Sequence, residues 1–354
     1  FRGVASFPQD KRAEHGYDNR ADHLTLSPLL MESFLNLSQT ISESPDLNSK
    51  ECRSWPWLFA SPENTTAEMM EEIIRSRLIK LLRRAFRRPV EPVTLDRFVK
   101  FALDQRDAGE TFENTMRSVI GVVLSMPDFL YFYGDADPEN PPNKSSDDKV
   151  IKEFELASRL ALFFWRSIPD DRLLDLAAEG KLSDPNVLSS EIDRMLNDHK
   201  SSRFCDNFPA QWLQLDRLIT SVPDPKKFPY FYLVDGYRSS MHMMPEPLLL
   251  FETIFIEDRS IIELLDPKYT WENAMLKANY EGHAKAGHDV VTQLFTRVPL
   301  SDPRRGGVIS NAAVMTMTAT PTRTQPITRG AWINAVIFND PPEPPPADVP
   351  PLPE

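Results

Sequence analysis

The residues that most often bind metals and cofactors are few in this 354-residue sequence. Cys52 and Cys205 are too few for a four-cysteine zinc site and too far apart for a Cys-x-x-Cys-His motif that attaches haem c. They could form one disulfide at most. His283 and His288 are five positions apart in a glycine-containing segment, which fits either a metal site or two solvated loop histidines. We therefore predict no metal site and no cofactor attached by a motif within this chain.

The run Met241–His242–Met243–Met244 offers thioether and imidazole ligands, which copper(I) prefers. Neighbouring residues on a helix point in different directions, so a chelate would need ligands from elsewhere in the fold. The alternative is that the methionines lie in the core and the histidine lies on the surface. We expect this second arrangement, because it needs no ligand from elsewhere in the fold.

Residues for nucleophilic or acid–base catalysis do not form a recognisable set. The sequence has no Gly-x-Ser-x-Gly elbow. Carboxylate pairs such as Glu252 with Glu257, or Asp170 with Asp171, are ordinary in a chain with 52 acidic residues, and helix capping explains them. The catalytic residues are therefore unknown, and the sequence favours a protein that is not an enzyme.

The charge of the chain limits its partners. A net charge of −12 argues against nucleic acid, because phosphate binding needs a surplus of Lys and Arg. No apolar run reaches the roughly 18 residues of a membrane span. One expected helix is basic, however, and such a helix either binds an anionic surface or pairs with the chain's own carboxylates. Its cations are Arg75, Arg77, Lys80, Arg83, Arg84, Arg87 and Arg88.

Helix signals recur along most of the chain and give the framework that would position these residues. Ser27–Pro28 and Asp184–Pro185 each place a capping residue before a proline, and Thr65–Glu68 has the pattern of a capping box. Thr94 and Thr111 are predicted to cap two more helices, and Gly180 to end a short one. Further helices are expected over 204–215, 236–257, 261–265 and 271–280.

The fold class predicted is mainly α, with two helical bundles, little β structure and an irregular, proline-rich C-terminal segment. Only 12 glycines accompany 32 prolines, which argues against hairpin-rich folds. Residues 134–149 have the composition of a linker, and Pro341–Pro353 is expected to form an extended polyproline strap suited to docking. The chain begins at Phe1 and is expected to be a mature or trimmed piece of a longer protein.

Five segments, taken together and in order, resemble the planctomycete-type cytochrome-associated proteins, which are large exported bacterial proteins built from domains of unknown function. The resemblance runs over most of the chain. The segments that carry it are 7–35 (FPQDKRAEHGYDNRADHLTLSPLLMESFL), 84–89 (RAFRRP), 156–182 with 208–215 (FPAQWLQL), 257–260 with 269–273 (YTWEN), and 302–307 (DPRRGG) with 320–324 (TPTRT) and 329–330. The resemblance implies five regions: the end of a first helical domain (1–45), a small helical domain (62–133), the linker (134–149), a larger helical domain (150–297) and the start of a cytochrome-like domain with its polyproline tail (298–354).

The resemblance also implies a periplasmic or cell-surface location, and haem c carried outside these residues. It makes the chain the haem-free helical body of a c-type cytochrome-like protein, for electron transfer or as a redox-complex scaffold. Its partners would be other subunits or a cytochrome domain, contacted through Pro341–Pro353. The guanidinium groups of Arg304, Arg305, Arg323 and Arg329 suit haem propionates or a partner's carboxylates, or else they cap helices and hold the strap. The main alternative is a non-redox structural or interaction subunit of an envelope complex, and a polysaccharide hydrolase is a third hypothesis.

Overall fold

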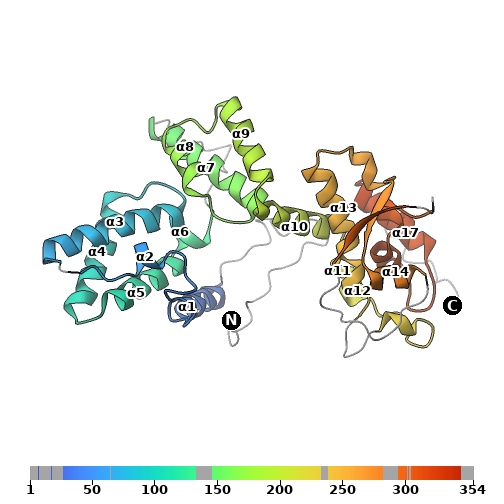
Figure 1. The fold of residues 1–354 in the computed structure, drawn as a ribbon, viewed down its shortest axis with the longest axis horizontal. Coiled ribbons are helices and arrows are strands. Elements are labelled where there is room, and N and C mark those ends of the chain that lie inside the picture. The colour runs from blue at the N-terminus through green and yellow to red at the C-terminus, as the bar shows by residue number, and fades with distance from the viewer. Residues whose placement is uncertain are drawn as a thin grey trace. The chain divides into compact units, whose positions relative to one another are not determined.

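The computed structural model describes residues 7, 17, 27–63, 65–132, 146–232, 238–281, 294–300, 302 and 304–343, and the structural statements below concern these residues. The protein is mainly α, as predicted, with a single two-stranded sheet in the part of the chain described (Figure 1). The chain divides into two compact units. Unit 1 comprises Phe1–Glu14 with Asp18–Asp198, and unit 2 comprises His15–Tyr17 with His199–Glu354. The domain boundaries expected from the resemblance remain a prediction.

The first part of unit 1 is a small helical bundle with its own core. Its helices are α1 (Pro28–Ser42), α2 (Trp55–Leu58), α3 (Ala67–Phe86), α4 (Pro92–Asp107), α5 (Phe112–Ser125) and α6 (Pro127–Leu130). α1 packs along α5, and α4 packs against both α3 and α5. The apolar stripe of α3 supplies the centre of the core, where Ile74, Leu78 and Leu82 are fully buried.

Local capping chemistry sets most of the helix starts in this bundle. The predicted caps Ser27 and Thr111 are confirmed, because each side-chain oxygen accepts a hydrogen bond from a first-turn amide. The capping box predicted over Thr65–Glu68 is displaced by one residue, since Thr66 is the cap and its hydroxyl accepts from the amide of Met69. The predicted cap Thr94 is wrong. The helix begins two residues earlier, at Pro92, because a proline suits the first helical position, where no amide hydrogen is needed.

The second part of unit 1 contains α7 (Ser146–Trp165), α8 (Asp171–Ala178) and α9 (Pro185–Leu196). Trp165 is fully buried, and its indole donates to the carbonyl of Met195 at 3.1 Å. The predicted caps Asp170 and Asp184 are confirmed, and Gly180 adopts the left-handed conformation (φ 66°) just after α8. These contacts hold α7, α8 and α9 together.

The basic side chains on and just after α3 bind groups of unit 1 itself, which confirms the intramolecular interpretation. Four of the arginines pair with carboxylates: Arg75 with Glu71 and Asp96, Arg83 with Asp175, Arg84 with Asp171, and Arg88 with Asp128. The other cations do not pair with carboxylates. Arg77 donates to the backbone carbonyls of Leu58 and Ala60, and Lys80 lies over the ring of Trp57. Arg87 donates to the backbone carbonyls of Asp128, Phe129 and Tyr131. Arg83 and Arg84 thereby join α3 to α8.

Unit 2 packs short helices around a second core. Its helices are α10 (Ser202–Trp212), α11 (Asp216–Thr220), α12 (Ser240–Met243), α13 (Pro245–Ile256), α14 (Ala274–Tyr280), α15 (Gly307–Ser310), α16 (Ala312–Met317) and α17 (Pro326–Trp332). Short 3₁₀ turns cover His199–Ser201, Pro229–Phe231 and Ile261–Leu264, and a π-helical turn, Ile333–Ile337, continues α17. Strands β1 (Tyr269–Glu272) and β2 (Thr296–Pro299) pair antiparallel, with Tyr269 opposite Pro299.

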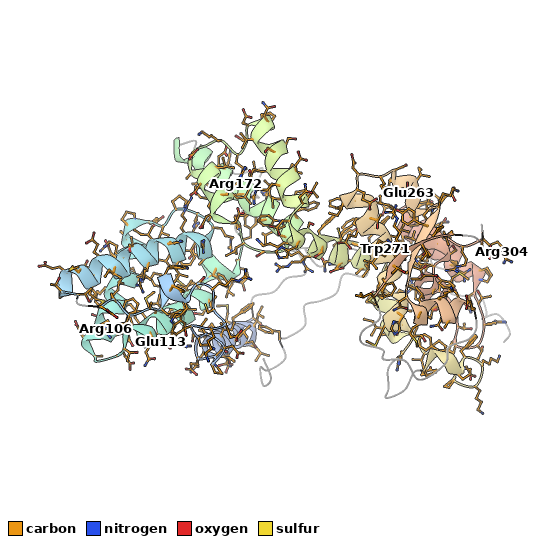
Figure 2. The ribbon with its side chains drawn as sticks, in the orientation of Figure 1. Arg106, Glu113, Arg172, Glu263, Trp271 and Arg304 are labelled. Carbon is orange, nitrogen blue, oxygen red and sulfur yellow. The ribbon has the colours of Figure 1, made fainter. Side chains whose placement is uncertain are left out.

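Several predictions in unit 2 need correction. Trp271 lies in strand β1 and not in a helix, because β1 pairs with a strand more than twenty residues later in the chain (Figure 2). The helix predicted over 236–257 is two helices, with Pro245 at the first position of the second. Residues 307–337, for which no helix was predicted, form α15, α16 and α17 with the π-helical turn. Most of the linker 134–149, His283, His288 and most of the Pro341–Pro353 strap lie outside the described residues.

Candidate functional site

A buried polar cluster lies at the centre of unit 2, around the carboxylate of Glu246 on α13. Glu246 is 5% exposed and accepts hydrogen bonds from the hydroxyls of Thr270 at 2.8 Å and Tyr280 at 2.6 Å. The backbone amide of Ala312, at the start of α16, donates to the Tyr280 hydroxyl at 2.7 Å. The cluster therefore connects α13, β1 and α14 to α16 through one carboxylate and one phenol.

Burial dominates the electrostatics of this cluster. Desolvation raises the pKa of Glu246, although its hydrogen bonds from Tyr280 and Thr270 act in the opposite direction. Desolvation also raises the pKa of Tyr280, and the Glu246 carboxylate adds to that shift. The guanidinium of Arg305 stacks on the Tyr280 ring at 3.6 Å and lies 3.8 Å from a carboxylate oxygen of Glu272. The positive charge of Arg305 also acts against the rise in the pKa of Glu246.

His242 occupies a second buried polar position, which corrects the expectation of a surface histidine. The side chain is 5% exposed, and its Nδ1 atom lies 2.9 Å from the side-chain nitrogen Nδ2 of Asn273. Burial lowers the pKa of His242, so the neutral ring is favoured. Met243 is buried as expected, whereas Met241 is 52% exposed. The run therefore does not place its sulfur atoms on one side of the imidazole.

The four arginines predicted as anchors fall into two pairs. Arg304 is at the surface and binds the carboxylate of Asp302 through Nε and Nη2 (Figure 2). Arg305 contacts Glu272 and Tyr280 as described above. Both guanidinium groups of this first pair already have an acidic neighbour, so their charge is compensated within unit 2.

The second pair consists of Arg323, on the loop between α16 and α17, and Arg329, in the last turn of α17. Arg329 donates from Nε to the Thr318 hydroxyl at 3.3 Å and from Nη2 to the Thr324 hydroxyl at 3.0 Å. Arg323 is exposed, and its amide closes a turn on the hydroxyl of Thr320 at 3.1 Å. No carboxylate contacts either guanidinium within the described ranges, and no interaction joins this pair to Arg304 or Arg305 there.

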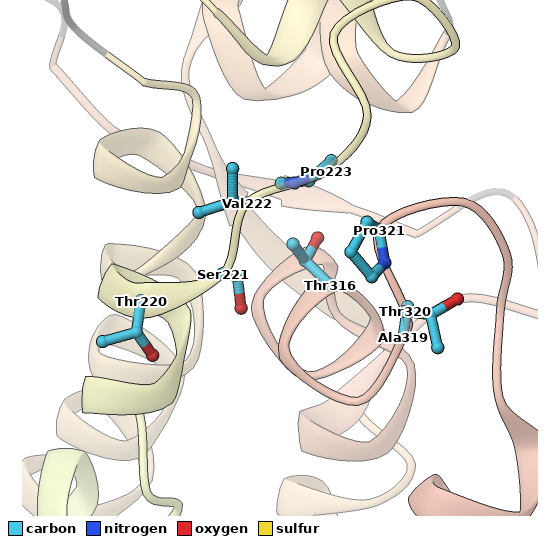
Figure 3. A pocket seen from close by; sticks show the side chains of 8 residues that line it. All are labelled: Thr220, Ser221, Val222, Pro223, Thr316, Ala319, Thr320 and Pro321. Carbon is cyan, nitrogen blue, oxygen red and sulfur yellow. The ribbon is translucent and has the colours of Figure 1, made fainter.

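A pocket of about 270 Å³ opens beside this loop (Figure 3). One wall is the end of α11 and the segment that follows, and the opposite wall is the end of α16 and its loop. The lining is uncharged and contains hydroxyls, prolines and small apolar groups: Thr220, Ser221, Val222, Pro223, Thr316, Ala319, Thr320 and Pro321. Thr220 and Ser221 donate to the carbonyl of Arg217, and Thr320 donates to that of Arg323.

Two lysines that sequence reasoning missed lie on the segment that continues the first wall. The amide of Asp224 donates to the carbonyl of Pro321 at 2.8 Å, which brings residues 224–227 against the arginine loop. Lys226 and Lys227 are exposed there, while the Asp224 carboxylate accepts their own backbone amides. No sequence signal links positions 97 residues apart (224 and 321), so only the fold could reveal this group of cations.

Comparison with models of known protein families finds matches for four stretches of the chain. Residues 1–44 match the PSD3 model (protein of unknown function, DUF1587), 74–133 match PSD5 (DUF1595), 151–281 match PSD4 (DUF1592) and 305–354 match PSCyt3 (DUF1588). All four models come from the planctomycete cytochrome-c-associated family. The chain carries four domains of this one set. Each is a domain of unknown function, and no curated protein or solved structure matches the chain.

The PSD4 and PSCyt3 segments share one core in unit 2. The indole of Trp212, in the PSD4 segment, donates to the carbonyl of Val336 at 2.9 Å, and the indole of Trp332 donates back to the carbonyl of Leu213 at 3.3 Å. The Glu246–Tyr280–Ala312 contacts cross the same boundary. The described residues of the PSCyt3 segment are therefore part of the core of unit 2.

The described residues do not fit a covalent haem c site. Cys205 is 1% exposed in the core of unit 2, and burial raises the pKa of its thiol to about 12. Cys52 is also a free thiol and lies in unit 1. Within the described ranges, no group of three or more His, Cys, Asp and Glu side chains could hold a metal ion. No helix there is long and apolar enough to cross a membrane.

Proposed function

We propose that this chain is the haem-free helical body of an exported c-type cytochrome-like protein, and that it serves electron transfer as a scaffold. The observation that carries the proposal is the packing of the PSCyt3 segment into unit 2. Trp332 is 3% exposed and Val336 is 8% exposed, and both belong to the same core as Leu213 and Leu276 of the PSD4 segment. A redox cofactor carried next to this segment would keep a fixed position relative to unit 2.

Fixed placement is what a scaffold contributes to redox chemistry, because the protein's part in such reactions is to bind, orient and tune the cofactor. The names of the matched domains point to the same association with cytochromes. Since Cys52 and Cys205 do not fit haem attachment, the proposal places haem c outside these residues, and a periplasmic or cell-surface location follows from the family resemblance.

The test is an absorption spectrum and an intact mass of the full-length protein purified from its native source. The proposal predicts a Soret band and a covalently bound haem that survives acid–acetone extraction. A full-length protein with neither would contradict the redox part of the proposal.

A second candidate function is a non-redox interaction subunit of an envelope complex. The observation that favours it is the exposed cationic surface beside the pocket, formed by Lys226, Lys227 and Arg323. Such a surface binds a partner whether or not haem is present. A native protein without haem that co-purifies stoichiometrically with another envelope protein would support this alternative.

A further inference from the structure

Two segments of unit 2 that are joined by a backbone hydrogen bond carry four cations beside the pocket. Residues 224–227 contribute Lys226 and Lys227, and residues 320–329 contribute Arg323 and Arg329. The hydrogen bond from the Asp224 amide to the Pro321 carbonyl joins the segments at 2.8 Å. We call these four residues the basic patch.

The charge of the basic patch is not compensated by its surroundings. Residues 303–339 contain four arginines and no acidic residue, in a chain whose net charge is −12. Arg304 and Arg305 have acidic neighbours, but no carboxylate contacts a side chain of the basic patch within the described ranges. The carboxylate of Asp224, in the first segment, accepts two backbone amides and forms no ion pair with the patch among the described residues.

Neutral hydrogen-bond partners orient the guanidinium of Arg329. Its Nε and Nη2 atoms bind two threonine hydroxyls, and one of these, that of Thr318, donates in turn to the carbonyl of Val314 at 2.6 Å. This arrangement fixes the plane of the guanidinium without neutralising it and leaves Nη1 without a partner among the described residues. A guanidinium fixed in this way loses little entropy when a carboxylate binds.

The pocket adds an uncharged surface to the cations. Its walls are the residues that lead into the two segments, with Val222 and Pro223 on one side and Pro321 on the other (Figure 3). Val222 is 53% exposed. A partner that presents carboxylates around a small apolar side chain would match both the charge of the patch and the lining of the pocket.

We propose that the basic patch and the adjoining pocket bind carboxylate groups on the acidic face of a partner protein. The carboxylates are those of Asp and Glu side chains, whose paired oxygens suit the planar guanidinium groups. The inference deepens the partner-binding part of the proposed function and does not depend on haem being attached to this protein.

The test titrates the full chain at low ionic strength with three probes and follows binding by calorimetry. The probes are a haem c peptide with free propionates, the same peptide with its carboxyls esterified, and a polyglutamate peptide. The inference predicts that polyglutamate binds. Binding of the free haem peptide alone, lost when its carboxyls are esterified, would assign the patch to propionates and contradict the inference. Binding should weaken at 0.5 M salt because the charges lie at the surface (~4 Å screening length).

Two triple variants with the same change in charge decide whether the patch is the site. Lys226→Gln with Lys227→Gln and Arg323→Gln removes only exposed cations, and we expect about a tenfold loss of affinity. Lys181→Gln with Lys268→Gln and Arg304→Gln removes cations that already have carboxylate partners, and we expect less than a twofold change. Equal losses in the two variants, or no binding of polyglutamate, would overturn the inference.

Discussion

Trp212 and Trp332 each donate an indole hydrogen bond to the main chain next to the other tryptophan. Trp212 binds the carbonyl of Val336, four residues after Trp332, and Trp332 binds the carbonyl of Leu213, the residue after Trp212. The two bonds join the end of α10 to α17 and its π-helical turn, across the boundary between the PSD4 and PSCyt3 segments. The two family segments therefore form one structural unit at this place.

Replacing Trp332 should destabilise unit 2 selectively. Trp332→Phe leaves the buried carbonyl of Leu213 without this donor and reduces the packed volume, so we expect a loss of about 2 kcal/mol in the free energy of unfolding. The measurement is urea unfolding followed by circular dichroism. Trp57→Phe, a change in unit 1 at a partly exposed ring, is the matched control and should leave the unit 2 transition unchanged. A Trp332→Phe protein as stable as wild type would refute the coupling.

Two glycines near the PSCyt3 boundary should respond in opposite directions to alanine. Gly307 has φ 67°, and a Cβ there would lie 2.5 Å from the carbonyl oxygen of Leu265, so Gly307→Ala should cost about 3 kcal/mol. Gly330, in α17, has no atom within 4 Å of an added Cβ, so Gly330→Ala should stabilise the protein by about 0.5 kcal/mol. The measurement is the thermal unfolding midpoint of each variant relative to wild type. A tolerated Gly307→Ala would show that α15 does not pack against the Ile261–Leu264 turn as described.

The buried carboxylate of Glu246 should give unit 2 a distinctive pH dependence. Because burial raises the pKa of Glu246 in the folded state, the folded protein binds its proton more tightly than the unfolded chain does. This contribution to stability is complete below the unfolded pKa of about 4.3 and is lost as the pH rises through the folded pKa.

The measurement compares the stability of wild type and Glu246→Gln from pH 4 to pH 8. We expect the wild type to lose stability relative to the variant as the pH rises. The comparison isolates Glu246 from Glu252 and Asp206, whose pKa values burial also raises, and from His242, whose pKa burial lowers. A difference that stays constant or changes in the wild type's favour would contradict the assignment.

The ion pair between Arg84 and Asp171 should stabilise unit 1 by a modest, acid-sensitive amount. The Arg84 guanidinium donates from Nε at 2.5 Å and lowers the pKa of Asp171. Its stabilisation is therefore present above the unfolded pKa of about 3.9 and is lost as the pH falls through the lower folded value. Because both side chains are partly exposed, Asp171→Asn should cost only about 1 kcal/mol at pH 7.

The control for this pair is Asp193→Asn, at an exposed position of α9, which should cost close to nothing. The measurement is the free energy of unfolding of both variants and of the wild type at pH 7 and at pH 2.5. A cost for Asp171→Asn that persists undiminished at pH 2.5 would mean that the side chain acts through something other than its charge.

The sequence predicts those parts of the fold that depend on neighbours in the chain. Ser27, Thr111 and Asp184 cap their helices as predicted because a cap needs only the residues of the first turn. Trp271 was assigned to a helix because strand β1 exists only by pairing with β2, and no local pattern reports that pairing. The helices after residue 307 were missed for a similar reason, since burial of Val314 and Trp332 in a distant core stabilises them.

The candidate site divides in the same way. Arg323 and Arg329 were singled out together with Arg304, although Asp302, only two residues from Arg304, could have indicated that Arg304 has a local partner. Lys226 joins them only through the contact between Asp224 and Pro321. Glu246 was not noticed because a single glutamate in an acidic chain has no signature of burial.

The central claim is that the PSCyt3 segment is an integral part of unit 2, so that a redox group carried beside it is fixed to the helical body. The most direct measurement introduces one protease site between Glu281 and Leu294 in the full-length protein, cleaves it, and follows the two pieces by size-exclusion chromatography in native buffer. We expect a single peak that contains both pieces, because the shared core and the two indole hydrogen bonds hold them together. Separation of the pieces under these conditions would contradict the central claim.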